Sequence, residues 1–309
     1  MITALQMSHC VVFHSYLRIE AFVYLDPHES ADGITLTLEQ AAAGPAQGFR
    51  FVRTHANGAH EMALEALVDR VSFPHGVSLR VRCGASTLVK TMDEVIAETA
   101  AVHRRDALTW DCLRAPLAAI AATGRRPRLL DLGGRRRSGI AYTDELAMCD
   151  VTVFDIVAGP GVDVTGDAHA LSRHFAPDTF DAVMCNSVFE HLLMPWKVAI
   201  ELGRVMRTGG LCYIHTHQTL GMHDMPWDFW RFSDQAWAGL FNARTGFEIV
   251  TARMSYFSHV VTAGWTPAYT GAEASGGFEA SGVLVRRIGA SDLDWDVTLA
   301  ETIATEYPK

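Results

Sequence analysis

The chain has 309 residues, of which 49% are hydrophobic and 20% charged, and its formal net charge is −9. These proportions are typical of a folded globular protein and exclude an intrinsically disordered chain. At roughly 150 residues per domain, the length predicts about two domains. The acidic balance disfavours a general binder of nucleic acid or of anionic membranes, because phosphate groups carry the same sign of charge.

Cysteine usage and hydropathy narrow the class of protein further. The six cysteines are scattered and form no CxxC pair, which favours free thiols in a reducing compartment over a disulfide framework or a zinc site. No apolar run approaches the roughly 18 residues that a membrane span needs. The start of the chain lacks the basic segment and the unbroken apolar core of a signal peptide. We therefore expect a cytoplasmic protein without a membrane segment.

Residues 1–86 are predicted to form a small all-β domain. Three stretches alternate between apolar and polar side chains: residues 11–25, 34–38 and 77–83. A period of two indicates strands with one buried face and one wet face. Turn-forming pairs such as Asn57-Gly58 separate the stretches. This pattern predicts an antiparallel sandwich or half-barrel.

The pattern changes after Ser86. Residues 87–124 carry apolar side chains at helical spacing, which predicts a connecting helix and then a helix packed on the next domain. Residues 125–309 alternate between strand and helix patterns. The predicted strands are 128–132, 151–155, 180–185, 210–217, 247–254 and 282–288, and the predicted helices include 194–206 and, with Ser233 as its cap, 234–243. Such alternation predicts an α/β fold with a mostly parallel sheet and helices on both faces, in which the last two strands form an antiparallel edge pair.

A ligand of such a sheet binds beyond the carboxyl ends of the strands. Asp131 and the pair Gly133-Gly134 end the first strand, and glycines let the backbone approach a ligand that a Cβ would block. Asp155 ends the second strand, 24 positions after Asp131. A carboxylate at this place can accept hydrogen bonds from both hydroxyls of a ribose. A nicotinamide-binding Rossmann domain is the alternative, but its G-x-G-x-x-G pattern is missing here.

Four motifs occur together between residues 125 and 250: LLDLGG, VTVFDI, GDAHAL and DTFDAVMCNSVFEHLLMPWKVAIELGRVMRTGG. This combination resembles the class I S-adenosylmethionine-dependent methyltransferases, specifically the glycan or small-molecule branch called type 11. The last motif is the most specific of the four. The resemblance implies a Rossmann-like, mostly parallel sheet of about seven strands, with S-adenosylmethionine as the cofactor.

The resemblance also implies cofactor contacts at four strand ends. These are Asp131, Gly133 and Gly134 at the methionine end, Asp155 at the ribose, Asp167 with Ala168 at the adenine, and Asn186 near the transferred methyl group. One departure from the family is that arginines occupy 135–137, where a further glycine often stands. Two interpretations stay open for them, a solvated loop or an anion contact with a phosphorylated or nucleotide-linked substrate.

The segment 215–233 follows the predicted fifth strand and is rich in histidine and tryptophan. It is similar to a segment in sugar- and glycan-directed members of the family, and aromatic rings beside fixed polar groups suit a sugar. We expect His223 or His217 to accept the proton of the acceptor, and Asp228 and Arg231 to orient the substrate. The alternative is that Asp228 and Arg231 pair with each other and fix the loop.

Two further features concern a metal site and a motif typical of the family. His215 and His217 share a strand face with Asp224 nearby in sequence, but no further ligand stands at a firm spacing, so we expect no metal site. The Glu190-His191 pair is a hallmark of the family with a role that differs between its members. We expect it to tether the short helix after the fourth strand.

The predicted function is O-methylation of a sugar hydroxyl, on a glycan or a glycosylated small molecule, with S-adenosylmethionine as methyl donor. N-methylation of an amino sugar, methylation of another natural product and an inactive cofactor-binding regulator stay open as alternatives. The expected partner is a small molecule or a glycan. The N-terminal β domain is expected to serve as a structural cap and a dimerisation surface, with a substrate-gripping module as the alternative.

Overall fold

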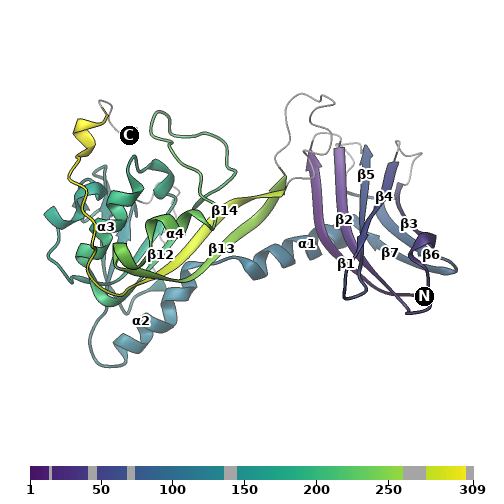
Figure 1. Cartoon of the computed structure of the whole chain (residues 1–309), viewed down its shortest axis with the longest axis horizontal. Helices are drawn as coiled ribbons and strands as arrows, with labels where there is room; N and C mark the ends of the chain where they lie inside the picture. The colour runs from purple at the N-terminus through teal and green to yellow at the C-terminus, as the bar shows by residue number, and fades with distance from the viewer. Residues whose placement is uncertain (14–15, 41–46, 68–73, 136–144, 260–275, 304–309) are drawn as a thin grey trace. The chain divides into compact units, whose positions relative to one another are not determined.

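The computed structural model describes residues 1–13, 16–40, 47–67, 74–135, 145–259 and 276–303 (Figure 1). The chain separates into two compact units. One consists of Met1–Arg105 with Phe257–Gly276, and the other of Asp106–Tyr256 with Gly277–Lys309. Each unit has a hydrophobic core of its own.

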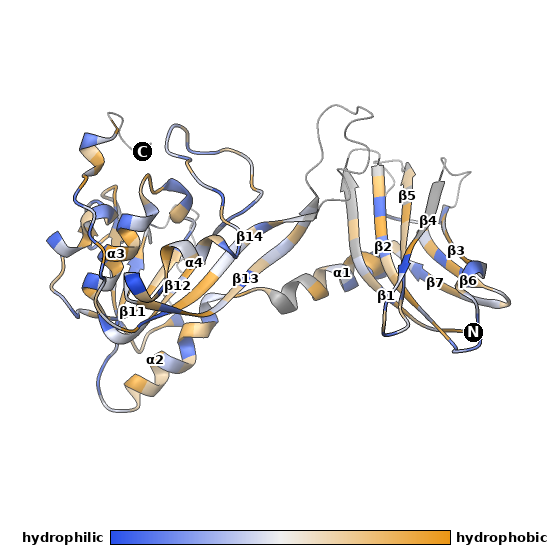
Figure 2. Ribbon diagram, in the orientation of Figure 1, coloured by the Kyte–Doolittle hydropathy of each residue, from blue (hydrophilic) through white to orange (hydrophobic). Residues whose placement is uncertain are grey.

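The first unit is built from two antiparallel sheets. Its strands are β1 (Ile2–Phe13), β2 (Tyr16–Leu25), β3 (Ile34–Gln40), β4 (Gln47–Thr54), β5 (His60–Leu67), β6 (Val77–Cys83) and β7 (Ser86–Thr91). One sheet has the order β1-β2-β5-β4 and the other β3-β6-β7. Apolar and polar residues alternate along β2, as Figure 2 shows. The apolar face of β2, which includes Leu17 and Ile19, joins Leu36 and Leu79 of the other sheet in one buried cluster, as expected for a sandwich.

Two details of this unit differ from the sequence prediction. The alternating stretch 11–25 spans two strands, because β1 and β2 form an antiparallel pair with Phe13 opposite Tyr16. The helix α1 (Met92–Asp106) begins later than expected, since β7 continues the sheet through Thr91. Glu94 accepts a hydrogen bond from the Thr91 backbone N (2.7 Å), and the Thr91 hydroxyl accepts one from the Glu94 backbone N (3.3 Å). This reciprocal cap sets the start of the helix.

One sheet of seven strands has the order β10-β9-β8-β11-β12-β14-β13 and lies in the second unit, apart from the last residues of β13 and the first of β14. The strands are β8 (Arg128–Leu132), β9 (Asp150–Asp155), β10 (Val164–Thr165), β11 (Phe180–Asn186), β12 (Met206–His217), β13 (Phe247–His259) and β14 (Gly276–Arg287). The pairs among β8 to β12 are parallel, and β14 runs antiparallel to β12. The α/β, Rossmann-like sheet with β13 and β14 as neighbours at its edge is therefore confirmed.

Helices cover both faces of this sheet (Figure 1). Leu130 and Leu132 of β8 belong to the same buried cluster as residues of α3 (Pro195–Val205) and α4 (Ala236–Leu240). Leu129, on the strand side that faces the other way, packs with residues of α2 (Arg114–Ala121). Successive side chains of a strand point to opposite faces, so one strand contributes to both clusters.

The helix predicted over 234–243 is shorter in the structure. The N-cap position of α4 is Gln235, without a side-chain cap bond, so the predicted Ser233 cap is wrong. The chain leaves the helix at Phe241, and the Asn242 side chain caps a separate 3₁₀ turn over Ala243–Thr245. An Asn that bonds the backbone of the next turn competes with continuation of the helix.

Short 3₁₀ turns complete the connections. They are η1 (Ala31–Gly33), η2 (Trp110–Leu113), η4 (Ala168–Arg173), η5 (Phe189–His191), η6 (Ala243–Thr245) and η9 (Leu299–Glu301). All six cysteines are free thiols. Within the described ranges, no helix has the length and apolar character needed to cross a bilayer.

Candidate active site

A cavity of about 560 Å³ lies at the carboxyl ends of the parallel strands. Residues that line it follow the ends of β8, β9, β10, β11 and β12. In the strand order, β8 lies between β9 and β11, so the connections leave β8 in one direction and return on its other side. A doubly wound sheet opens a crevice for ligands at such a switch point.

All seven residues that the resemblance assigns to the cofactor line this cavity. They are Asp131, Gly133, Gly134, Asp155, Asp167, Ala168 and Asn186. The three carboxylates therefore share one cavity, which is the geometric condition that the cofactor assignment requires. The roles of the individual residues stay predictions.

The glycine pair after β8 leaves no room for side chains. Gly133 has a φ of +78°, and a Cβ there would overlap the Val188 side chain. A Cβ on Gly134 would overlap the Asp131 carboxyl group. Two glycines therefore let the loop close over Asp131, as their position in the sequence predicted.

Asp155 lies at the end of β9 beside an arginine. Its Oδ1 accepts a hydrogen bond from the Val157 backbone N (2.8 Å) and lies 3.8 Å from the Arg135 Nε. The Arg135 side chain is 19% exposed and lines the cavity, so it does not project into solvent. The rest of the arginine triplet lies outside the described residues. Arg135 thus places a positive charge inside the cavity, which the solvated-loop interpretation did not predict.

Asp167 is fixed by a neighbouring histidine that the sequence analysis did not single out. The Met194 backbone N donates to His169 Nε2 (3.2 Å), so Nε2 is an acceptor and Nδ1 carries the ring hydrogen. That Nδ1 donates to Asp167 Oδ1 (2.7 Å). Burial alone would raise the pKa of Asp167, but the contacts with His169 outweigh it and lower this pKa. The carboxylate is therefore charged and held in one orientation.

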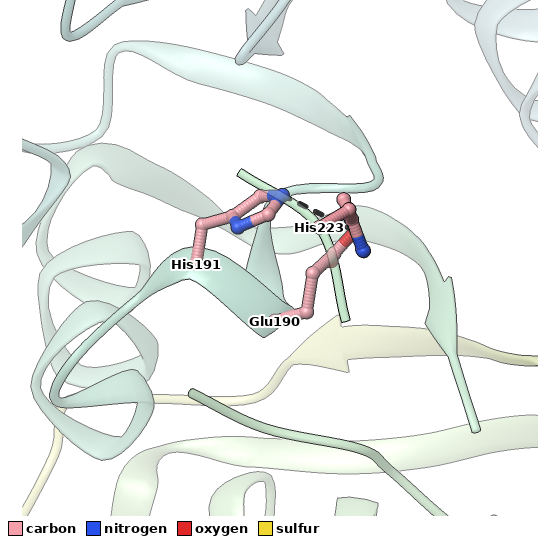
Figure 3. A group of neighbouring side chains, drawn as sticks. All are labelled: Glu190, His191 and His223. Carbon is pink, nitrogen blue, oxygen red and sulfur yellow. Dashed lines mark ion pairs between the residues drawn. The ribbon is translucent and has the colours of Figure 1, made fainter. Parts of the chain in front are cut away.

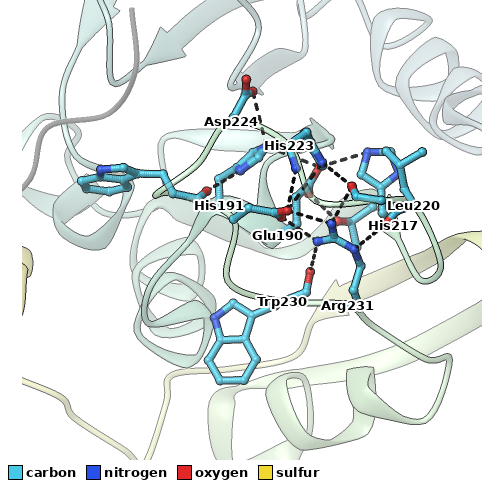
Figure 4. A network of polar contacts seen from close by, with 12 residues as sticks. Glu190, His191, His217, Leu220, His223, Asp224, Trp230 and Arg231 are labelled. Carbon is cyan, nitrogen blue, oxygen red and sulfur yellow. Dashed lines mark hydrogen bonds and ion pairs between the residues drawn. The ribbon is translucent and has the colours of Figure 1, made fainter.

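Three histidines surround the carboxyl group of Glu190 (Figure 4). Glu190 Oε1 lies 3.2 Å from His217 Nε2, 3.7 Å from His191 Nε2 and 4.0 Å from His223 Nε2. The Thr216 hydroxyl donates to the second oxygen, Oε2. We call Glu190, His191, His217 and His223 the histidine cluster. All three of its histidines line the cavity.

Glu190 is ionised in this setting although it is fully buried. Burial would raise its pKa, but the contacts with His217 and Thr216 outweigh that effect and hold the pKa below its ordinary value. Burial together with the neighbouring His217 lowers the pKa of His215. The cluster therefore contains one buried negative charge.

Of the four predicted catalytic residues, His217 and His223 line the cavity, whereas Asp228 and Arg231 do not. Arg231 donates two hydrogen bonds to the Asp228 carboxylate (2.6 and 2.8 Å). These bonds lower the pKa of Asp228 to about 2. Arg231 also donates to the backbone carbonyl of Leu220 (2.8 Å), and Asp228 accepts from the His223 backbone N (2.9 Å). Such contacts brace the loop, as in the alternative that the sequence left open.

The aromatic residues of the same loop divide between the cavity, the protein core and the surface, where Trp230 is 38% exposed. Trp227 lines the cavity and is 3% exposed. Trp230 packs edge-on against Trp196, with ring centroids 6.0 Å apart, and does not line the cavity. Phe232 stacks on the buried Trp237 at 5.0 Å. One of the two tryptophans of this loop therefore lines the cavity.

The Glu190-His191 pair does more than the tether that we expected. The Glu190 carbonyl accepts from the backbone N of Phe229 (2.8 Å) and Trp230 (3.2 Å), so it fixes the loop after β12. His191 faces the cavity from η5. The sequence does contain a feature that could have predicted this position of His191. The pair follows β11 within a few residues, at the edge of the sheet where ligands bind.

The residues that could hold a metal also differ from those considered from the sequence. From the sequence, His215, His217 and Asp224 were considered as possible metal ligands. The structure groups Glu190, His191 and His223 instead, with ligand atoms that all lie within 4.8 Å of one another.

Comparison with known proteins identifies the class of domain. Residues 138–214 match the family model described as "Methyltransferase domain". S-adenosylmethionine is accordingly the cofactor of this domain. No curated protein matches the chain.

Three of the solved structures that match this chain are described as methyltransferases. A protein of Bacillus halodurans C-125 assigned as a methyltransferase is 16% identical, and the alignment covers 57% of this chain and 98% of that one, with a TM-score of 0.41. The 1,6-didemethyltoxoflavin-N1-methyltransferase of Burkholderia thailandensis, solved with S-adenosylhomocysteine, is 19% identical (68% and 96% covered, TM-score 0.38). An S-adenosylmethionine-dependent methyltransferase of Aquifex aeolicus is 14% identical (56% and 89% covered, TM-score 0.36).

Proposed function

We propose that the protein transfers the methyl group of S-adenosylmethionine to a hydroxyl of a sugar, on a glycan or a glycosylated small molecule. The observation that carries this proposal is that one cavity is lined by two chemically different sets of residues, which we assign to a cofactor part and an acceptor part. One set contains Asp131, Asp155 and Asp167, and the other contains the three histidines of the cluster and Trp227. The first part suits an adenosyl sulfonium, and the second suits a neutral acceptor that must lose a proton.

In the cofactor part, each acid has a distinct partner in the proposal. Asp155 keeps one carboxylate oxygen for the ribose hydroxyls, while the other accepts from the Val157 backbone. Asp167, fixed by His169, accepts from the exocyclic amine of the adenine. Asp131 and the glycines after β8 lie against the methionine end.

In the acceptor part, Trp227 offers an apolar ring face to a sugar, and His217 or His223 accepts the proton of the attacked hydroxyl. Methyl transfer from a sulfonium is an in-line displacement, so positioning supplies the larger share of catalysis, about 7–11 kcal/mol. A general base contributes about 10²–10⁴-fold. Arg231 and Asp228 serve this part indirectly, by holding the loop that carries His223.

Calorimetry with S-adenosylhomocysteine tests the cofactor part. We expect one binding site per chain and an affinity at least about tenfold weaker in Asp155→Ala, because a ribose contact worth ~1.4 kcal/mol or more is lost. The matched control is Asp150→Ala, at the opposite end of the same strand, where the exposed carboxylate pairs with Arg126. An unchanged affinity in Asp155→Ala contradicts the assignment.

Transfer of a labelled methyl group tests the acceptor. Labelled S-adenosylmethionine is incubated with the protein and a cell extract, and the labelled products are treated with glycosidases. Label released on a methylated neutral sugar supports the proposal. Label on an amine or on a compound without sugar supports one of the alternative acceptors, and cofactor binding without any transfer supports a regulatory protein.

A further inference from the structure

Two histidines of the cluster present lone pairs to the same carboxylate oxygen. His191 Nδ1 lies 2.5 Å from the Trp227 carbonyl oxygen, and His223 Nδ1 lies 3.1 Å from the Gly221 carbonyl oxygen. A carbonyl oxygen only accepts, so each Nδ1 carries the ring hydrogen. In the neutral rings Nε2 is then an acceptor, and these two atoms lie 3.7 and 4.0 Å from Glu190 Oε1.

Glu190 Oε1 is the third acceptor atom at this place. The Glu190 side chain is 0% exposed, and among the described residues Oε1 makes no well-aligned hydrogen bond, although His217 Nε2 lies 3.2 Å away. A buried, unpaired polar atom is costly, and an ionised one more so. Three convergent acceptors are stabilised if a positive charge lies between them.

We infer that Glu190, His191 and His223 bind a divalent transition-metal cation of the Zn²⁺ type (Figure 3). Their ligand atoms all lie within 4.8 Å of one another. Ligands around a tetrahedral Zn²⁺ stand about 2.1 Å from the metal, and hence about 3.4 Å from each other. The side chains therefore need to move by less than ~1 Å to grip the ion. Two imidazoles and one carboxylate suit Zn²⁺ or Fe²⁺, whereas Mg²⁺ and Ca²⁺ prefer oxygen ligands alone.

The surroundings of the site resemble those of a metal centre. A metal-bound histidine usually donates its second ring N–H to a carbonyl or carboxylate, which fixes the ring. His191 and His223 both make this bond to backbone carbonyls. The Asp224 carboxylate lies 4.0 Å from His191 Nε2 and adds negative charge. The nearby Arg231 is paired with Asp228 through both carboxylate oxygens.

This inference rests on the proposed function and sharpens it. His191 and His223 line the cavity, so a cation with three protein ligands keeps an open position toward the acceptor. An oxygen of the sugar fits that position, because Zn²⁺ accepts oxygen ligands. With His223 engaged as a ligand, His217 is the histidine of the cluster outside the ligand set. If the cation binds, His217 rather than His223 is the candidate that accepts the proton of the acceptor.

The test is direct metal binding to the full chain without a polyhistidine tag. The protein is stripped with a chelator and titrated with ZnCl₂ by calorimetry, and with Co²⁺ by visible absorption. We expect one equivalent of Zn²⁺ and the intense bands of a low-symmetry Co²⁺ site. Loss of an outer contact costs about 10–100-fold in metal affinity, so Glu190→Gln and His223→Ala should each weaken binding by at least about 100-fold. The control His28→Ala removes an exposed histidine of the first unit and should change nothing.

Thermal melting of each variant verifies that it folds. If Glu190→Gln does not fold, His223→Ala provides the test, because the His223 side chain is 30% exposed. The inference is overturned if the wild type binds no Zn²⁺, or if either folded variant binds it as the wild type does. S-adenosylhomocysteine binding is measured on the same samples. Cofactor binding without Zn²⁺ binding removes the metal site alone, and Zn²⁺ binding without cofactor binding removes the proposed function.

Discussion

The two parts of the cavity, called here the cofactor half and the histidine cluster, are built in different ways. The cofactor half consists of residues that stand at the ends of consecutive strands, and Asp167 is fixed by His169, two positions further along the chain. The histidine cluster joins three separate segments, since Glu190 and His191 follow β11, His217 ends β12 and His223 lies in the loop beyond. The residues of the cofactor half are placed by the strands that carry them. The histidine cluster forms only when separate segments of the chain come together.

This difference implies that the two halves can be disabled separately. A substitution in the cofactor half should remove cofactor binding, whereas a substitution in the histidine cluster should remove turnover and leave cofactor binding intact. The predictions below test this separation, from the largest expected effect to the smallest.

Replacing His217 should give the largest effect. We expect His217→Ala to lower the rate of methyl transfer by about 10²–10⁴-fold, as for loss of a general base. The dissociation constant for S-adenosylhomocysteine should stay within about twofold, because a change of less than ~0.4 kcal/mol is expected outside the cofactor half. Single-turnover transfer of labelled methyl and calorimetry measure the two quantities. Equal losses in both would show that the halves are not separate.

The converse substitution is Gly134→Ala. The added Cβ would overlap the Asp131 carboxyl group, so either this acid or the loop must move. We expect S-adenosylhomocysteine to bind about 100-fold more weakly, which corresponds to ~2.7 kcal/mol. Gly239→Ala is the matched control, because a Cβ there meets nothing within 4 Å. Wild-type affinity in Gly134→Ala would mean that the cofactor does not require this loop geometry.

The sequence predicted the two halves with unequal success for the same reason. Asp131 and the glycines are contiguous, and a strand of five residues brings them to the ligand edge without further information. The histidine cluster requires the register between β11 and β12, which places Asn186 opposite His215. Periodicity indicates which residues are strands, but it does not fix their register with a neighbour.

The same limit explains the smaller errors. The shortened helix α4 and its misplaced cap follow from competition by Asn242, whose side chain bonds the next turn. Asp228 and Arg231 were identified as a pair, but only the folded loop shows that neither lines the cavity. Chemistry at a strand end was therefore predictable, whereas chemistry assembled by a loop was not.

A third prediction concerns stability and lies outside both halves. Asp181, near the start of β11, accepts two hydrogen bonds from Arg125 (2.7 Å each) and one from the Arg128 backbone N (2.8 Å). We expect Asp181→Asn to lower the free energy of unfolding by about 2 kcal/mol, roughly 30-fold in the folding equilibrium. Cofactor affinity of the folded fraction should be unchanged. Denaturant unfolding and calorimetry provide the two measurements.

The pH dependence of this effect has a definite sign. Burial would raise the pKa of Asp181, but the bonds from Arg125 and Arg128 outweigh it, so this pKa is lowered in the folded state. The stabilisation is therefore complete above the unfolded pKa, about 3.9, and is lost as pH falls through the lower folded pKa. Wild type and Asp181→Asn should differ by a constant amount above about pH 5 and converge in more acidic solution. A difference that grows on acidification would contradict the assignment.

The smallest effect should come from the positioning residue of the cofactor half. His169→Leu removes the ring bond to Asp167 but keeps the bond from the His169 backbone N (2.9 Å), so Asp167 becomes less fixed without being lost. We expect about fivefold weaker binding of S-adenosylhomocysteine, or ~1 kcal/mol. Adenosine alone should lose the same factor, because in the proposal Asp167 touches the adenine. His174→Leu, a neighbouring histidine outside the cavity lining, is the control. If adenosine binding is unaffected while S-adenosylhomocysteine binding weakens, Asp167 serves the other end of the cofactor, and the order of contacts along the cavity is reversed.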